Sequence, residues 1–207
     1  SDWSSDVCSS DLQLLVEGCG AGYHNSIFRG KNLGSTITDA QYAAINAGTF
    51  DDLFVGDYWD FVIDGVNVRA VIAGFNIQGI GGYGNWTMSA PNITLWFLPY
   101  GDNAAEWNFY LNDGPVDPET GWKGMTIYTE TLPALLEKIE TVIPSAHILT
   151  GNVSVCDAVN SNGTRSHAVT ESQSIFMPTW PQITGAWSDD NSAYPRLDIQ
   201  WPLTRHM

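Results

Sequence analysis

The chain has 207 residues, with 23 acidic and 8 basic side chains, a formal net charge of −15 and a hydrophobic fraction of 43%. This excess of acid argues against nucleic-acid binding, which needs a basic surface, and against attraction to anionic membranes. The sequence has no run of 18 apolar residues, so we expect no membrane insertion.

The first segment, residues 2–12, reads DWSSDVCSSDL and has neither helical nor strand periodicity. In order, its residues match the translation of a common short-read sequencing adapter. We therefore expect residues 1–22 to be an artefactual or disordered N-terminus and set them aside, as one does a processing scar. About 185 residues remain, which fits a single α+β domain at 23–207. We expect that domain to be truncated at its C-terminus.

Residues 36–48, TITDAQYAAINAG, form the first predicted helix. Thr38 and Gln41 have the spacing of a capping box, and Gly48 supplies a stop. Alanines recur at helical spacing and predict a small-residue face that packs closely on a sheet. These alanines are Ala40, Ala43, Ala44 and Ala47.

Residues 56–75 predict a β-hairpin, because Asp64-Gly65 is the typical pair for a two-residue type I′ turn. That turn fixes the register and places six apolar residues on one face, as the pairs Ile63/Val66, Phe61/Val68 and Trp59/Ala70. The opposite face then brings Asp60 next to Arg69 as a cross-strand charge pair.

The remaining elements are less sharply marked. We expect strands at 93–99, 107–111 and 147–150, and a second helix at 131–144 that Thr131 caps and whose apolar residues follow the 3.6 period. From Gly151 to the end, turn residues and scattered aromatics dominate. The predicted fold is α+β: an antiparallel sheet with two helices packed on it.

Aromatic side chains in loops rich in Gly, Pro and Asn are the candidate ligand-binding residues. Exposed Trp and Tyr stack on apolar sugar faces or anchor protein interfaces, although any single one could instead close the end of a small core. Two or three on one side of the molecule would indicate a binding surface. The candidates are Tyr83, Trp86, Trp107, Trp122, Trp180 and Trp187.

Calcium is the one cofactor that the sequence suggests. Asp113, Asp117 and Glu119 lie in one Gly/Pro-rich loop and offer hard oxygen ligands. Their spacing does not match an EF-hand, and ordinary turn chemistry explains them equally well. The four histidines share no metal-ligand spacing and are interpreted as structural.

Several motifs together resemble a domain of phage and prophage proteins from gut Firmicutes. The first third of the chain carries the most specific ones, and the match extends from Tyr23 to Leu203. In chain order the motifs are YHNSIFRGKNLG (23–34), TDAQYAAINAGTFDDLFVGDYW (38–59), IDGVNVR (63–69), MTIYTETLPALLEKI (125–139), SAHILT (145–150) and DIQWPL (198–203).

The chain departs from that family in two places. Pro99-Tyr100 stands where the family has a Pro-Asp pair, and the family continues past the Q-W-P-L segment into a C-type-lectin-like close. The resemblance therefore implies an incomplete C-type-lectin-like domain.

The resemblance implies a non-enzymatic structural or host-attachment protein of the phage tail region, located in the virion or outside the cell. Implied partners are other virion proteins or a host-surface glycan, and the implied assembly is a homo-oligomer. No catalytic residue carries over. A secreted bacterial carbohydrate-binding module is the alternative, and an enzyme is the third option, which a deep cleft with paired carboxylates would indicate.

Overall fold

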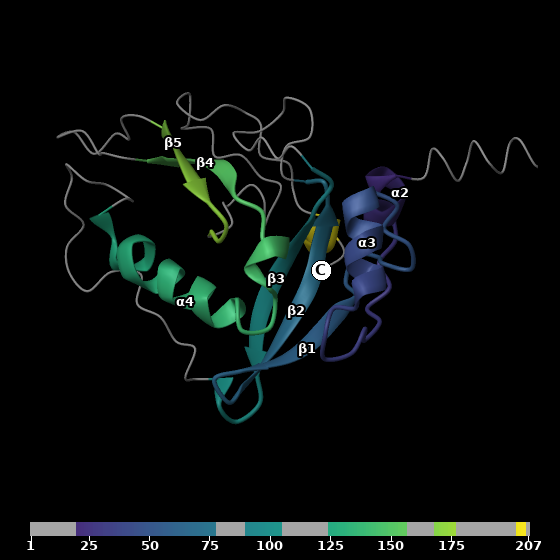
Figure 1. Ribbon diagram of the computed structural model, residues 1–207, viewed down its shortest axis with the longest axis horizontal. Helices are drawn as coiled ribbons and strands as arrows, with labels where there is room; N and C mark the ends of the chain where they lie inside the picture. The colour runs from purple at the N-terminus through teal and green to yellow at the C-terminus, as the bar shows by residue number, and fades with distance from the viewer. Residues whose placement is uncertain (1–19, 78–89, 105–123, 157–167, 177–201, 206–207) are drawn as a thin grey trace, which may run out of the picture.

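A three-stranded antiparallel sheet flanked by helices forms the centre of the computed structural model (Figure 1). The structure describes residues 20–77, 90–104, 124–156, 168–176 and 202–205. The strand order is β1 (Tyr58–Ile63), β2 (Val66–Phe75), β3 (Ile93–Tyr100). This arrangement confirms the predicted α+β class with an antiparallel sheet.

In the view of Figure 1, α2 and α3 lie to the right of this sheet and α4, β4 and β5 lie to its left. β4 and β5 pair as a separate two-stranded antiparallel sheet. The bounds are α2 (Ala21–Ser26), α3 (Asp39–Ala47), the π-helix η3 (Ile127–Thr131), α4 (Leu132–Ile139), the 3-10 turn η4 (Ser145–His147), β4 (Gly151–Cys156), β5 (Ala168–Gln173) and α6 (Pro202–Arg205).

The β1–β2 hairpin has the register that its turn predicts. Asp64 and Gly65 both have positive φ angles, 52° and 77°, as a type I′ turn requires. The predicted pairs face one another across the strands, and all six apolar side chains are at most 1% exposed. Burying a large apolar side chain contributes about 1.5–3 kcal/mol, so this face forms the base of the core.

A β-bulge in β2 keeps the core face continuous to the end of the strand. The pairing of β2 with β3 shifts between Ile72 and Gly74, so one extra residue interrupts the alternation of side chains. Phe75 therefore joins the face of Ile72 and contacts Phe50, with ring centroids 4.9 Å apart. Without the bulge, Phe75 would point to the opposite face of the sheet.

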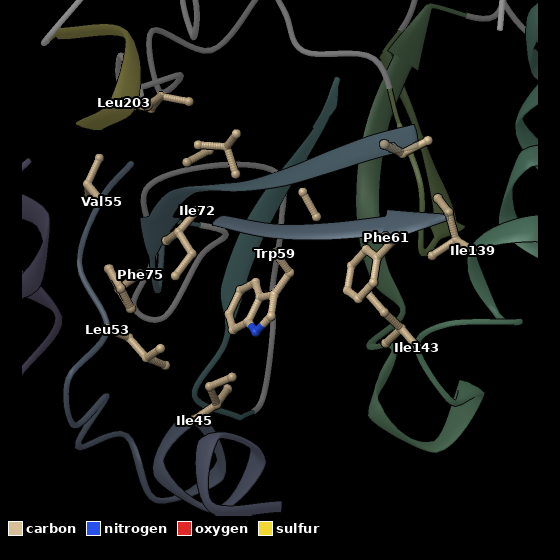
Figure 2. Close-up of a cluster of buried hydrophobic side chains, with 14 of the residues drawn as sticks. Ile45, Leu53, Val55, Trp59, Phe61, Ile72, Phe75, Ile139, Ile143 and Leu203 are labelled. Carbon is tan, nitrogen blue, oxygen red and sulfur yellow. The ribbon is translucent and has the colours of Figure 1, made fainter. Parts of the chain in front are cut away.

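Helices α3 and α4 cover the core face at different points (Figure 2). Ile45 of α3 lies below Trp59, and the indole Nε1 of Trp59 donates to the side-chain oxygen of Gln41 at 3.3 Å. Ile139 at the end of α4 and Ile143 just after it lie beside Phe61. The prediction that the two helices pack on the sheet is therefore confirmed.

The capping box of α3 is confirmed, but the predicted alanine face is wrong. Thr38 and Gln41 bond reciprocally, and Gly48 ends the helix with φ 71°. Only Ala44 is buried, together with Ile45, and the remaining three alanines are exposed. The helix is rotated toward Ile45 because the larger side chain gains more from leaving water than an alanine does.

The second predicted helix begins earlier and ends earlier than the periodicity indicated. The π-helix Ile127–Thr131 leads directly into α4, which ends at Ile139. Thr131 makes no capping hydrogen bond, because helical backbone runs from the π-helix through Thr131 into α4, whereas a capping residue needs a non-helical backbone. The predicted apolar stripe does face the core, since Leu132, Ile139 and Ile143 are all buried.

The strand predicted at 147–150 is wrong. Pro144 is followed by a 3-10 turn, in which the N–H of His147 donates to the carbonyl of Pro144 at 2.8 Å. The strand begins instead at Gly151, in the part of the chain where turn residues predicted no regular structure. The strand predicted at 107–111 lies outside the described residues.

Candidate functional site

The motif residues of the first third of the chain form one cluster, which we call the Asp57 clasp: Arg29, Lys31, Asp52, Phe54 and Asp57. Residues 28–34 run parallel to residues 55–60 along the edge of β1, with bridges at Phe28/Val55 and Asn32/Tyr58. Backbone bonds along this edge bring Arg29 and Lys31 next to the loop that carries Asp52 and Asp57.

Asp57 is completely buried and fully hydrogen-bonded. Its Oδ1 accepts from Nε of Arg29 at 3.0 Å and from the backbone N–H of Lys31 at 2.9 Å. Its Oδ2 accepts from Nη2 of Arg29 at 2.6 Å and from the backbone N–H of Phe54 at 2.8 Å. A buried carboxylate is tolerated only when its oxygens are paired in this way.

Asp52 lies on the solvent side of the clasp. Lys31 Nζ donates to Oδ2 of Asp52 at 2.7 Å, and Arg29 pairs with its Oδ1. These two cations lower the pKa of Asp52 to about 2, from the usual 3.8. The guanidinium of Arg29 also lies over the ring of Phe54, 4.6 Å from its centroid, so the cation is held on three sides.

His24 and Asn25, in the Tyr-His-Asn-Ser motif, fasten α2 to the core. Nδ1 of His24 lies 2.6 Å from the carbonyl of Leu53, and because a carbonyl only accepts, Nδ1 carries the proton. The side-chain amide of Asn25 donates to the carbonyl of Phe75 at 2.9 Å, and its oxygen accepts from the Phe75 N–H at 2.8 Å. Asn25 therefore substitutes for a neighbouring strand at the end of β2.

Gly56 is required by close packing. It has φ 85°, and a Cβ at this position would lie 2.2 Å from the ring of Phe28. Both the backbone conformation and the approach of the ring exclude a side chain here. The most specific motif residues thus have roles in holding the fold together.

The face of the sheet opposite the core presents side chains to solvent. We call it the open sheet face. It is formed by alternate residues of the three strands that pair in rows across the sheet. The rows run from the hairpin end inward as Val62, Asn67, Tyr100; Asp60, Arg69, Leu98; and Tyr58, Val71, Trp96.

The hairpin end of the open sheet face has a large apolar component. Val62 is 62% exposed, Leu98 41% and Tyr100 37%, whereas Val71 is 7% exposed, so burial increases away from the hairpin turn. Three large apolar side chains close together on a rigid sheet are more than the scattered single residues that any surface carries. This grouping makes the hairpin end a candidate contact surface.

Arg69 stands at the centre of this surface. Its Nε donates to Oδ1 of Asp60 at 2.9 Å and its Nη2 to Oδ2 at 3.3 Å. Its guanidinium carbon lies 3.9 Å from the ring centroid of Tyr58 and 5.1 Å from that of Tyr100. The hydrogen bonds to Asp60 raise the pKa of Arg69 further above its usual value.

The side chain of Asp60 is itself held in place, since it also accepts from Nδ2 of Asn32 at 3.0 Å. Arg69 is thus fixed by a carboxylate on one side and by aromatic rings on two others. In the described part of the chain, Nη1 of Arg69 and the side-chain amide of Asn67 form no hydrogen bond to protein. Among the described residues, nothing occupies these donors.

The ligand-binding aromatics and calcium ligands that the sequence suggested all lie outside the described residues, so the structure does not test them. They are Tyr83, Trp86, Trp107, Trp122, Trp180 and Trp187, and for calcium Asp113, Asp117 and Glu119. Among the residues that the structure does describe, no group of three or more His, Cys, Asp or Glu side chains could hold a metal ion.

Sequence reasoning missed the open sheet face as a site, although its signal was present. The Asp60–Arg69 pair was predicted, and the same alternation extends to Val62 and Tyr58 on β1. Pairing of β3 with β2 adds Leu98 and Tyr100, which the sequence does not align with Arg69.

Among the described residues, the helices are all too short or too polar to cross a membrane. A scan against protein-family models and searches of curated proteins and of solved structures found no significant match.

Proposed function

We propose that this chain is a non-enzymatic structural or host-attachment protein of a phage virion, and that it makes contact through the open sheet face. The motif resemblance supports the phage assignment. The observation that supports a contact function is the open sheet face, which combines exposed Val62, Leu98 and Tyr100 with an immobilised Arg69. Aromatic and arginine side chains on a rigid support are the residues that dominate protein and ligand contacts.

The geometry of the motif residues fits this proposal. The buried carboxylate, Asp57, has all its described partners within the protein and serves the fold. Asp52 is paired with two cations. Because Asp57 and Asp52 are already occupied within the protein, we propose that partners bind at the open sheet face. These partners are other virion proteins or a surface component of the host.

Virion membership can be tested with an antibody raised against the recombinant full-length chain. Phage particles from gut samples would be purified on a density gradient and examined by immunogold electron microscopy. We expect gold at the tail region, and labelling that disappears when the antibody is first absorbed with the recombinant protein. Antigen confined to the particle-free fraction would contradict the proposal.

A secreted bacterial carbohydrate-binding module is the second candidate. The arrangement of Tyr58, Arg69 and Tyr100 favours it, because tyrosine rings and fixed polar groups together suit a sugar. In that case the antigen would be found in the medium of bacterial cultures and absent from phage particles.

A further inference from the structure

We infer that the hairpin end of the open sheet face is a binding site for an uncharged saccharide, centred on Arg69 between Tyr58 and Tyr100. This inference deepens the proposed function, on which its biological setting rests, by naming the class of ligand. It depends on three features of the site: the way Arg69 is held, the balance of charge, and the mixture of polar and apolar groups.

The site is organised before any ligand arrives. Asp60 binds the guanidinium of Arg69 at 2.9 and 3.3 Å, Asn32 holds Asp60 at 3.0 Å, and the tyrosine rings lie 3.9 and 5.1 Å from the guanidinium carbon. A long side chain held in this way loses little further freedom on binding. Such preorganisation lowers the entropic cost that limits weak surface contacts.

Charge balance selects an uncharged ligand. Asp60 neutralises Arg69 directly, and no other charged residue belongs to the three rows of the open sheet face. The chain as a whole carries a net charge of −15, which repels anions. An anionic sugar would therefore have to compete with Asp60 for the cation while approaching an acidic protein.

The groups that bond to no described residue have the chemistry of sugar recognition. Nη1 of Arg69 and the amide of Asn67 can donate to hydroxyl oxygens, and the amide oxygen of Asn67 can accept from a hydroxyl. Tyr100 and Leu98, 37% and 41% exposed, flank these donors with apolar surface. A saccharide ring has matching C–H faces and hydroxyl edges, which a purely apolar partner lacks.

The test uses the full-length chain on an array of neutral oligosaccharides of hexoses and N-acetylhexosamines, with matched sialylated and uronic-acid-containing compounds. Calorimetry with each soluble hit then compares the wild type with Asn67→Ala and Tyr100→Ala. The matched control is Glu137→Ala, on the exposed side of α4. Circular dichroism verifies that every variant is folded.

We expect binding to neutral compounds, weakened at least about fivefold by Asn67→Ala and by Tyr100→Ala and unchanged by the control. Binding confined to the acidic compounds would overturn the ligand class. Neutral binding that both variants leave intact would overturn the site. A dimer that Leu98→Asp dissociates, without glycan binding, would assign the face to a second copy of the chain and overturn the inference.

These outcomes separate the inference from the proposed function. Gold-labelled virions with no glycan binding would leave the phage assignment standing and overturn the saccharide site. Neutral-glycan binding without virion labelling would support the site and move the protein to the secreted binding modules.

Discussion

Asp57 contributes to stability through the partners that surround it, and Arg29 is the one of these that carries charge. The side chain of Asp57 has no exposed surface, so loss of a partner leaves a charge in a region that water does not reach. The two backbone N–H donors would remain. A single polar substitution in the Asp57 clasp should therefore have a large effect on the free energy of unfolding.

Arg29→Ala is therefore expected to lower the free energy of unfolding by about 3 kcal/mol, the lower end of the range for breaking a buried pair. Urea denaturation followed by circular dichroism measures it. Arg69→Ala is the matched control, because its partner Asp60 is 22% exposed, and it should cost less than about 1 kcal/mol. Equal losses in the two variants would show that burial of the carboxylate does not decide the effect.

Asp52 predicts a dependence of stability on acid pH. Its pKa is about 2 in the folded chain and 3.8 as the usual value, so the folded state binds its proton less readily than the unfolded state. The stabilisation is present above pH 4 and is lost as the pH falls from about 4 to about 2. Since the side chain is 66% exposed, solvent screening limits the effect to less than about 1 kcal/mol.

The measurement compares urea midpoints of the wild type and Asp52→Asn between pH 2 and pH 5. The two curves should converge toward pH 2 and separate as the pH rises to 4, where the wild type is the more stable. Parallel curves over that range would contradict the assignment of Arg29 and Lys31 as the groups that hold the Asp52 carboxylate charged.

At the scale of elements, α4 is attached to the sheet by its C-terminal end. Ile139 and Ile143 are 4% and 6% exposed and lie beside Phe61, and Lys138 pairs with Asp64 of the hairpin turn at 2.7 Å. The ion pair joins two exposed side chains and contributes little. Burial of the isoleucines therefore holds the helix in place.

Ile139→Ala should lower the free energy of unfolding by about 2–5 kcal/mol, as the loss of buried methyl groups leaves a cavity. Glu137→Ala on the exposed side of the same helix should change it by less than about 0.5 kcal/mol. Thermal denaturation of both variants checks the difference. If Ile139→Ala left the free energy of unfolding unchanged, α4 would not be part of the cooperative core.

At the scale of the whole molecule, β2 is the element on which the others depend. It pairs with β1 on one edge and β3 on the other, and its residues from Ala70 to Phe75 are buried on both faces. We therefore expect the amides of Val68, Ala70 and Ile72 to reach solvent only on global unfolding.

Hydrogen exchange measured by NMR should therefore find those three amides the slowest among the described residues, with protection equal to the global free energy of unfolding. The N–H groups of Asp102 and Asn103, in the exposed loop after β3, provide the fast reference on the same chain. Faster exchange in β2 than in α3 would mean that the sheet opens before its helices do.

Local signals in the sequence determined the β1–β2 hairpin, the capping box of α3 and the apolar stripe of α4. Each depends on residues within a few positions of one another: a two-residue turn, the Thr38–Gln41 pair, and a 3.6 period. These three signals involve only short-range bonds, so they can be recognised without knowing which distant segments pack nearby.

Only the tertiary structure decided which face of α3 is buried, where β2 has its bulge and what the motif acids bind. Arg29 reaches Asp57 across 28 positions and Asn25 reaches Phe75 across 50, distances over which no spacing rule applies. Such contacts form only after the chain has folded, because they depend on which segments the burial of apolar surface brings together. The open sheet face has the same origin, since β3 places Leu98 and Tyr100 beside Arg69 only when the sheet has formed.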